Sequence, residues 1–220
     1  MLTSVLAGLS ILIIGDSHLT VPYYLIDSLH MGLERQGAQV HTIGVCGANP
    51  GDWLKPVKGT CGAAERRGDA AVQVLDVNTP ATPIDQLLAR DKPDLVVIVM
   101  GDTMAGYQQA TFPKTWAWQQ VTALTQTVAK ANTACVWIGP AWGTEGGKYQ
   151  KTFARAKQVS AFLSSNVAPC QYIDSLKLSK PGEWATTDGQ HFTKSGYEAW
   201  GKALTQQLAQ SSIVQELKKK

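Results

Sequence analysis

Two short segments near opposite ends of the chain carry residue types that could perform nucleophilic catalysis. Residues 15–18 read Gly-Asp-Ser-His directly after an apolar run, and residues 188–191 read Asp-Gly-Gln-His. A serine hydroxyl needs an imidazole to take its proton, and the imidazole needs a carboxylate to fix its tautomer. Because Asp188 and His191 are three residues apart, the carboxylate can hold one ring nitrogen and leave the other for Ser17. We therefore predict a catalytic triad of these three residues.

The same residues also allow plainer interpretations. Taken alone, Ser17 could be a turn or helix-capping residue, and His191 could lie solvated in a surface loop. The other histidines are weaker candidates for the base: His30 falls within an expected helix and His41 at an expected strand, neither near an upstream carboxylate suited to orient it. We expect His18 to shape the pocket, because its place next to the nucleophile does not suit a base.

The elements that must position these segments follow from hydrophobic periodicity. Short apolar runs predict five buried strands, at residues 10–14, 40–45, 94–100, 135–138 and 171–174. Helical spacing predicts helices at residues 21–36, 83–90, 113–131, 149–166 and 195–210. This alternation predicts an α/β fold, a three-layer α/β/α sandwich with a five-stranded parallel sheet. Ligands of such sheets bind beyond the carboxyl ends of the strands, which is where residues 15–18 lie.

Bulk properties exclude several classes of protein. With 220 residues, the chain suits one domain over residues 1–220, and we expect the tail after about residue 212 to be frayed. A net charge of +3 without a dense Lys/Arg stripe gives no reason to expect nucleic-acid binding. No segment has the roughly 18 continuous apolar residues of a membrane span. The apolar residues 1–10 lack a basic segment, and we interpret them as the trimmed start of a mature domain rather than a signal peptide.

Four cysteines bear on the cellular compartment. Cys46 and Cys61 bracket a loop rich in Gly, Pro and Lys that we expect over residues 46 to about 69, while Cys135 and Cys170 lie at two expected strands. Two local disulfides, Cys46–Cys61 and Cys135–Cys170, would suit an exported periplasmic or extracellular protein. Four reduced thiols are the alternative. None of the spacings matches a CxxC zinc motif, so we expect no metal site.

Taken together and in this order, residues 15–17 after the first strand and Asp188-x-x-His191 before the last helix resemble the SGNH hydrolase superfamily, also called GDSL-like. The resemblance covers nearly the whole chain. It implies a flavodoxin-like sandwich, ester hydrolysis or acyl transfer without a cofactor, Ser17 as nucleophile, His191 as general base and Asp188 as its orienter.

The resemblance also implies three donors to the oxyanion of the reaction intermediate. The backbone N–H of Ser17 is one, and Gly47, in the segment after the second strand, is the counterpart of a glycine donor. The third is an asparagine side chain in the family, but this sequence has Thr103 at that position. Either the Thr103 hydroxyl or the amide of Asn49 could replace it. Losing one such donor typically costs about two to three orders of magnitude in turnover.

The substrate is less well indicated. Trp53 and Trp142 lie among Gly, Pro and Asp residues after strands, so we expect them, with Asp102, at a substrate-binding rim, and we expect Trp116 or Trp118 and Trp137 to pack in the core. An exported SGNH protein whose 46–61 loop is closed by a disulfide resembles the enzymes that add or remove O-acetyl groups on bacterial polysaccharides or peptidoglycan; this resemblance rests on family analogy. The expected partner is an acylated carbohydrate bound by a monomer. A lipolytic esterase or thioesterase and a non-catalytic carbohydrate-binding relic are the alternatives.

Overall fold

The computed structural model describes residues 4–56 and 58–219, and it contains a seven-stranded sheet in the order β4-β3-β2-β1-β5-β6-β7. The strands are β1 (Ser10–Gly15), β2 (Gln39–Val45), β3 (Ala63–Arg67), β4 (Gln73–Leu75), β5 (Leu95–Val99), β6 (Ala134–Ile138) and β7 (Gln171–Ile173). The five parallel strands, β2-β1-β5-β6-β7, are those that the apolar runs predicted. The α/β class is confirmed.

The predicted number of strands was wrong. The segment expected to be a loop, residues 46 to about 69, contains β3, and β4 follows shortly after it. The two strands add an antiparallel hairpin to the sheet beside β2. The sequence of β3, Ala-Ala-Glu-Arg-Arg, is too short and too charged for a buried strand, and a Gly- and Pro-rich stretch precedes it. β3 pairs with β2 on one side and with the three-residue edge strand β4 on the other. Hydrophobic runs alone therefore could not reveal this hairpin.

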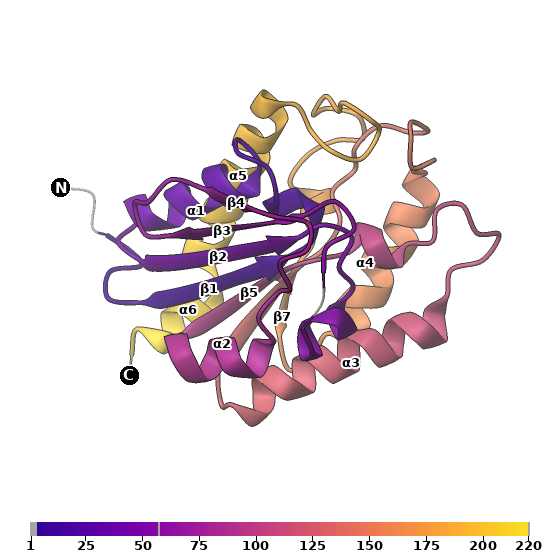
Figure 1. The fold of residues 1–220 in the computed structure, drawn as a ribbon. Helices are drawn as coiled ribbons and strands as arrows, with labels where there is room; N and C mark the ends of the chain where they lie inside the picture. Colours follow the sequence, from indigo (N-terminus) through magenta and orange to yellow (C-terminus); the bar gives the residue numbers. More distant parts are fainter. Residues whose placement is uncertain (1–3, 57, 220) are drawn as a thin grey trace.

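Helices cover both faces of the sheet (Figure 1). They are α1 (Leu25–Arg35), α2 (Ile84–Asp91), α3 (Lys114–Lys130), α4 (Phe153–Asn166), α5 (Lys194–Gln210) and α6 (Ser212–Leu217). Alternate residues of β1 enter two separate cores: Leu12 and Ile14 pack toward α2, α3 and α4, whereas Ile11 and Ile13 pack toward α1, α5 and α6. This is the predicted three-layer sandwich.

The C-terminal tail is more ordered than the sequence suggested. Residues 212–217 form α6, which is capped by the Ser211 hydroxyl and buries Val214 against the core. The expected fraying beyond residue 212 was therefore wrong for these residues. Residues 1–3 and 220, which belong to the expected mature start and the basic tail, lie outside the described residues.

Both expected disulfides are present, Cys46–Cys61 and Cys135–Cys170. The first ties the end of β2 to the start of the β3–β4 hairpin, and the second ties β6 to the residue before β7. Disulfides of this kind are typical of proteins that fold in oxidising compartments. Within the described ranges, no helix is both long and apolar enough to cross a membrane.

Candidate active site

Ser17 lies in the turn between β1 and the short 3-10 helix η1 (Ser17–Leu19). Gly15, the last residue of β1, must be glycine here, because a Cβ atom would come within 2.4 Å of the Val99 carbonyl oxygen on β5. The Asp16 carboxylate caps η1 by accepting from the His18 N–H at 3.1 Å. Burial raises the pKa of Asp16 to about 6. The nucleophile candidate is thus held on a rigid turn at the carboxyl end of the central strand.

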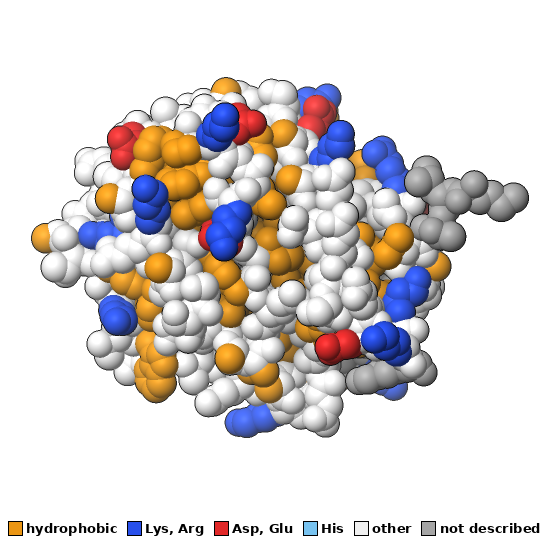
Figure 2. All heavy atoms as spheres, turned by 180° about the vertical axis from the view of Figure 1, so that it is seen from behind, with side chains coloured by type: hydrophobic (Ala, Val, Ile, Leu, Met, Phe, Trp, Pro, Cys, Tyr) orange, Lys and Arg blue, Asp and Glu red, His pale blue; other side chains and the backbone are white. Residues whose placement is uncertain are grey.

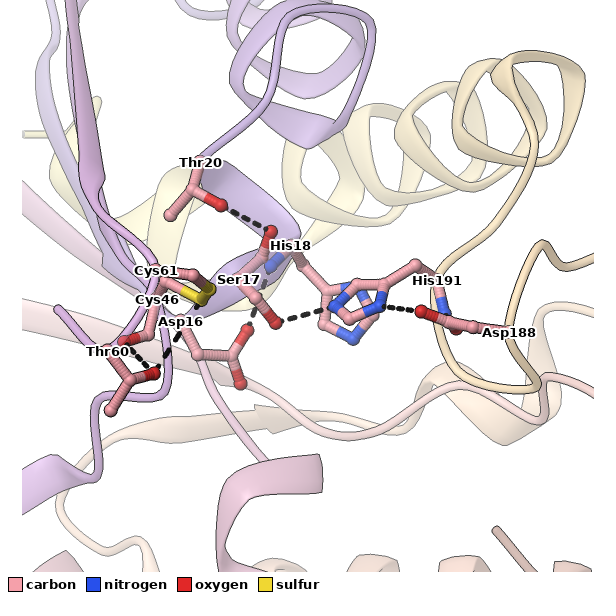
Figure 3. Close-up of a disulfide and its surroundings, with 9 residues drawn as sticks. All are labelled: Asp16, Ser17, His18, Thr20, Cys46, Thr60, Cys61, Asp188 and His191. Carbon is pink, nitrogen blue, oxygen red and sulfur yellow. Dashed lines mark hydrogen bonds and ion pairs between the residues drawn. A yellow bond between two sulfur atoms is a disulfide. The ribbon is translucent and has the colours of Figure 1, made fainter. Parts of the chain in front are cut away.

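Ser17, His191 and Asp188 lie in one hydrogen-bonded line (Figure 3). The Ser17 Oγ is 2.7 Å from His191 Nε2, and His191 Nδ1 is 2.7 Å from Asp188 Oδ2. The other Asp188 oxygen accepts from the backbone N–H groups of His191 at 2.7 Å and Gln190 at 3.0 Å. These bonds orient the carboxylate toward the imidazole, so the three side chains that the sequence predicted are brought together at this site.

Electrostatics keep the histidine neutral and the carboxylate charged. Burial, and then the neighbouring His18, lower the pKa of His191 below its usual value. Burial alone would raise the pKa of Asp188, but its hydrogen bonds from His191 and Gln190 outweigh that effect and lower it. At neutral pH the pair is therefore a neutral imidazole beside a carboxylate, the state that accepts a proton from a serine.

The backbone N–H groups of Ser17 and Gly47 are the two donors that the sequence predicted for the oxyanion. Among the described residues, the N–H groups of Ser17 and Gly47 donate to no acceptor, although both residues lie at the carboxyl ends of strands. Gly47 has a φ of +77°, which favours glycine, and a Cβ atom there would lie 2.6 Å from the Thr60 Oγ1. Its neighbour Cys46 belongs to the disulfide that lies on the other side of Ser17 from His191 in Figure 3. The Cys46–Cys61 link and Thr60 thus hold the Gly47 turn.

The two candidates for a third donor differ in their surroundings. The Thr103 Oγ1 is buried and has no hydrogen-bond partner within the described part of the chain. The Asn49 side-chain nitrogen instead lies 3.4 Å from the Asp52 Oδ2, which also accepts from the Asn49 backbone N–H at 2.8 Å. One N–H of the Asn49 amide is thus directed to Asp52 at the start of the short helix η2 (Pro50–Leu54), whereas Asn49 Oδ1 and the Thr103 hydroxyl have no partner among the described residues.

A buried charged network that the sequence analysis did not anticipate lies behind the triad. Asp102 accepts from Lys151 Nζ at 2.8 and 3.0 Å and from the Tyr107 hydroxyl at 2.5 Å, and its second oxygen is 3.1 Å from His18 Nε2. The other ring nitrogen of His18 is 2.8 Å from the Tyr197 hydroxyl. Burial would raise the pKa of Asp102, but the Lys151 charge and the remaining bonds lower it well below its usual range.

This network contacts His191 through His18. The rings of His18 and His191 have centroids 5.2 Å apart, and Tyr24 and Tyr149 contact two further sides of His191. Lys151 is fully buried although it lies in the loop after β6; helical spacing predicted a helix from residue 149, but α4 begins only at Phe153. A lysine in such a segment is normally solvated, so only its pairing with Asp102 explains its burial.

The loop that carries Asp188 packs closely against the loop after β6 and is hydrogen-bonded to it through backbone groups. The Lys148 N–H donates to the Asp188 carbonyl at 2.9 Å, and the Thr144 N–H donates to the Gly189 carbonyl at 2.9 Å. A Cβ atom at Gly147 would lie 2.1 Å from the Asp188 carbonyl oxygen, and one at Gly143 would lie 2.4 Å from that of Gly189. The two loops can approach this closely only because these positions lack side chains.

A cavity of about 320 Å³ opens directly beside Ser17. Its walls include Ser17, His191, the Cys46–Cys61 disulfide, Val21 and Val74, the last of which comes from the unexpected strand β4. Val21 and Val74 are 42% and 66% exposed, so they form an apolar lip around the mouth of the cavity. A substrate carbonyl group at Ser17 would place its acyl group against these surfaces.

The residues expected at a substrate-binding rim are not there. Trp53 is fully buried, Asp102 is 5% exposed within its ion pair, and Trp142 is 8% exposed with its indole N–H donating to two carbonyl groups of residues 176 and 179. One of Trp116 and Trp118 was expected in the core, but they are 38% and 50% exposed, while Trp137 is buried as expected. These predictions relied on the Gly and Pro content of neighbouring residues. They failed because contacts with distant parts of the domain decide which indole ring is buried.

A metal-ion site requires a group of ligating side chains that lie close together. Among the residues that the structure describes, no group of three or more His, Cys, Asp or Glu side chains could hold a metal ion. Lys and Arg side chains are dispersed over the face seen in Figure 2, with no continuous basic patch there.

Comparison with solved structures identifies the class of fold. A DUF4886 family protein from Bacteroides uniformis matches 93% of this chain and 84% of its own length with a TM-score of 0.63 and 14% identity. Axe2, an acetylxylan esterase from Geobacillus stearothermophilus solved as a catalytic mutant, covers 92% and 95% of the two chains with a TM-score of 0.55 and 14% identity. A Slackia heliotrinireducens protein assigned to the SGNH hydrolases covers 91% and 98%, with a TM-score of 0.54 and 18% identity. The chain therefore has the fold of the SGNH hydrolase superfamily, as the sequence predicted.

Comparison with known sequences gives one family. No family model matches the chain. Protein BcsX from Komagataeibacter xylinus is 43% identical over 208 residues, which are 93% of this chain and 78% of that protein. The chain belongs to the BcsX family.

Proposed function

We propose that this protein is a serine-dependent O-acyl ester hydrolase that removes short acyl groups, acetyl above all, from a bacterial polysaccharide or peptidoglycan. The observation that carries the proposal is the line of hydrogen bonds from Ser17 through His191 to Asp188, with two free backbone N–H groups beside it. A serine held only as a turn residue would need neither a buried imidazole nor an oriented carboxylate. The SGNH esterase fold supports the same reaction class.

In the proposed mechanism, Ser17 Oγ attacks the ester carbonyl carbon while its proton passes to His191 Nε2. The imidazolium, held by Asp188 at Nδ1, then gives this proton to the oxygen of the leaving sugar hydroxyl as the ester bond breaks. Water attacks the acyl–serine carbonyl carbon, again losing a proton to His191. That proton returns to Ser17 as the carboxylic acid leaves, so the enzyme is regenerated.

The negative charge that develops on the carbonyl oxygen requires donors that are already in place. The N–H groups of Ser17 and Gly47 supply two in the proposed site, and the buried Thr103 hydroxyl supplies a third in place of the family's asparagine. A threonine reaches less far than an asparagine and donates a single proton. We therefore expect turnover to be slower than an asparagine at this position would allow.

The size of the cavity and the likeness to Axe2 support the proposed substrate class. The cavity beside Ser17 is small and apolar, which suits a short acyl chain better than a long one. Axe2 is named as an acetylxylan esterase, an enzyme that takes acetyl groups from a polysaccharide. Two disulfides support an exported site of action in the periplasm or outside the cell, where such polymers lie.

The test is release of p-nitrophenol from acetyl, butyryl and octanoyl esters by the native protein, Ser17→Ala and Ser164→Ala. Ser164 is an exposed serine on α4 and serves as the matched control. We expect acetate to be the best substrate, Ser17→Ala to be inactive and Ser164→Ala to equal the native protein. A preference for octanoate would favour the lipolytic alternative. Activity that survives in Ser17→Ala would overturn the proposed mechanism.

A further inference from the structure

A second, larger cavity adjoins the catalytic one. It has a volume of about 920 Å³ and lies along α1 and α5, closed at one side by the segment between β3 and β4. Both cavities are lined by Pro22, which stands as the partition between them. Tyr23, the next residue, belongs to the larger cavity, and Tyr24 belongs to the catalytic one. The groove therefore begins a few residues after the nucleophile.

The helix that follows His191 in the chain, α5, forms one wall of the same groove. Lys194, three residues after His191, begins α5 and lines the groove together with Glu198 and Lys202. From Lys194 to Gln206, the last residue of α5 in the lining, the helix rises by ~18 Å. A chain of several sugar rings could lie along such a length with one of its esters at Ser17.

Tyr23 is held so that its ring faces solvent. Its side chain is 60% exposed, and its backbone has a φ of +76°, a conformation that bulky residues rarely adopt. The Tyr23 N–H donates to Asp27 Oδ2 at 2.7 Å, and Asp27 in turn pairs with Arg66. The Lys194 ammonium lies 5.0 Å from the centroid of the Tyr23 ring. A strained residue that displays an aromatic ring at a groove is typical of a binding position.

The rest of the groove combines apolar surface with polar groups, as a carbohydrate ligand requires. Ten of its sixteen lining residues are polar or charged, and they include both acidic and basic side chains. Donors and acceptors of both kinds fit sugar hydroxyl groups, which donate and accept hydrogen bonds. The surface that these residues present to the groove is mainly apolar, and sugar rings also have apolar C–H faces that pack on such a surface.

We propose that this groove binds the polysaccharide chain that carries the ester, with Tyr23 stacking on a sugar ring next to the acylated one. The proposal rests on the proposed esterase function, which it extends by assigning the polymer to the α1–α5 side of the nucleophile. Tyr23 acts in binding, not in chemistry, so its loss affects polymers and leaves small esters untouched.

The test compares Tyr23→Gly, Tyr23→Phe and Trp118→Ala on two substrates, acetylated xylan and p-nitrophenyl acetate. Glycine removes the ring and accepts the positive φ without strain, so the thermal midpoint of Tyr23→Gly should equal or exceed that of the native protein. We expect its kcat/KM on acetylated xylan to fall about tenfold, mainly through KM, as for the loss of one aromatic contact. Its rate on p-nitrophenyl acetate should remain within twofold. Tyr23→Phe and Trp118→Ala, an exposed aromatic residue on α3, should match the native protein on both.

A binding assay without turnover separates this proposal from the esterase proposal. In native gels that contain acetylated xylan, Ser17→Ala should be retarded, and Ser17→Ala combined with Tyr23→Gly should run as in a gel without polymer. Retardation by the first variant and release by the second would support the groove even if no ester is cleaved. Absence of retardation, or equal retardation of both, would overturn the proposal. So would a parallel loss of activity on both substrates in Tyr23→Gly.

Discussion

Two histidines of this protein bond carboxylates in nearly the same way, yet only one sits in a site that could catalyse a reaction. At the carboxyl end of the sheet, His191 meets Asp188 with one ring nitrogen and the Ser17 hydroxyl with the other, each at 2.7 Å. Toward the amino end, His41 meets Asp91 at 2.5 Å and Glu65 at 2.8 Å. The difference lies in the second partner.

An imidazole between two carboxylates has no nitrogen left to accept a proton from a nucleophile. His41 also belongs to a wider ionic cluster, because Arg67 bonds both of its carboxylate partners and Arg90 bonds Asp91. Burial would raise the pKa of Asp91, but its bonds from Arg90 and His41 lower it to about 2. That end of the sheet is a satisfied structural network. A cavity lies at each end, of about 420 Å³ beside His41, Asp91 and Arg67 and of about 320 Å³ beside His191. What distinguishes His191 is that one ring nitrogen meets the Ser17 hydroxyl instead of a second carboxylate.

The sharpest test of this comparison replaces each histidine by glutamine. His191→Gln removes the base and should lower kcat on p-nitrophenyl acetate by about a million-fold, to the background of the remaining site. His41→Gln should leave kcat within twofold and lower the thermal midpoint, because a buried network loses a member. A comparable loss of turnover in His41→Gln would break the comparison.

The carboxylates should separate the two ends in the same way with a smaller effect. Asp188→Asn leaves the imidazole in the wrong tautomer and should lower kcat by about 10⁴-fold with little change in KM. Asp91→Asn should leave steady-state kinetics unchanged. If Asp188→Asn retained a tenth or more of the native kcat, the orienting role of Asp188 would be wrong.

Unused donors at the catalytic end predict a further, smaller effect. Thr103→Val keeps the shape of the side chain but removes the hydroxyl, and it should lower kcat by about 100-fold, as for the loss of one oxyanion donor. Asn49→Ala should not affect kcat, because that amide faces Asp52. The reverse pattern, with Asn49→Ala slow and Thr103→Val normal, would assign the third donor to Asn49.

The pH dependence should show the smallest effect. Because burial and His18 lower the pKa of His191, this base stays neutral, and therefore active, to a lower pH than an exposed histidine. The profile of kcat/KM should rise with pH through a midpoint below 6.5 and then level off. His41→Gln should leave this midpoint where it is. A midpoint above 6.5 would mean that the Asp188 charge outweighs burial.

The sequence predicted those features that local patterns specify. Continuous apolar runs identified all five parallel strands, and the spacing of Asp188 and His191 identified the pair that lies beside Ser17. It failed where distant parts of the chain decide. Lys151 is buried because Asp102 lies 49 positions earlier, and β3 exists because β2 offers it an edge. Neither dependence leaves a trace in a window of neighbouring residues.

The close approach of Gly143 and Gly147 to the Asp188 loop limits which substitutions this protein can accept in evolution. Any side chain at Gly147 or Gly143 would displace the loop that aims the carboxylate, so a lineage that keeps catalysis must keep both glycines. Val74 and Tyr23 lie at the mouths of the two cavities and carry no such restriction. If the proposed function holds, substitutions at Val74 and Tyr23 would change which esters enter, whereas the orientation of Asp188 would stay fixed by the two glycines.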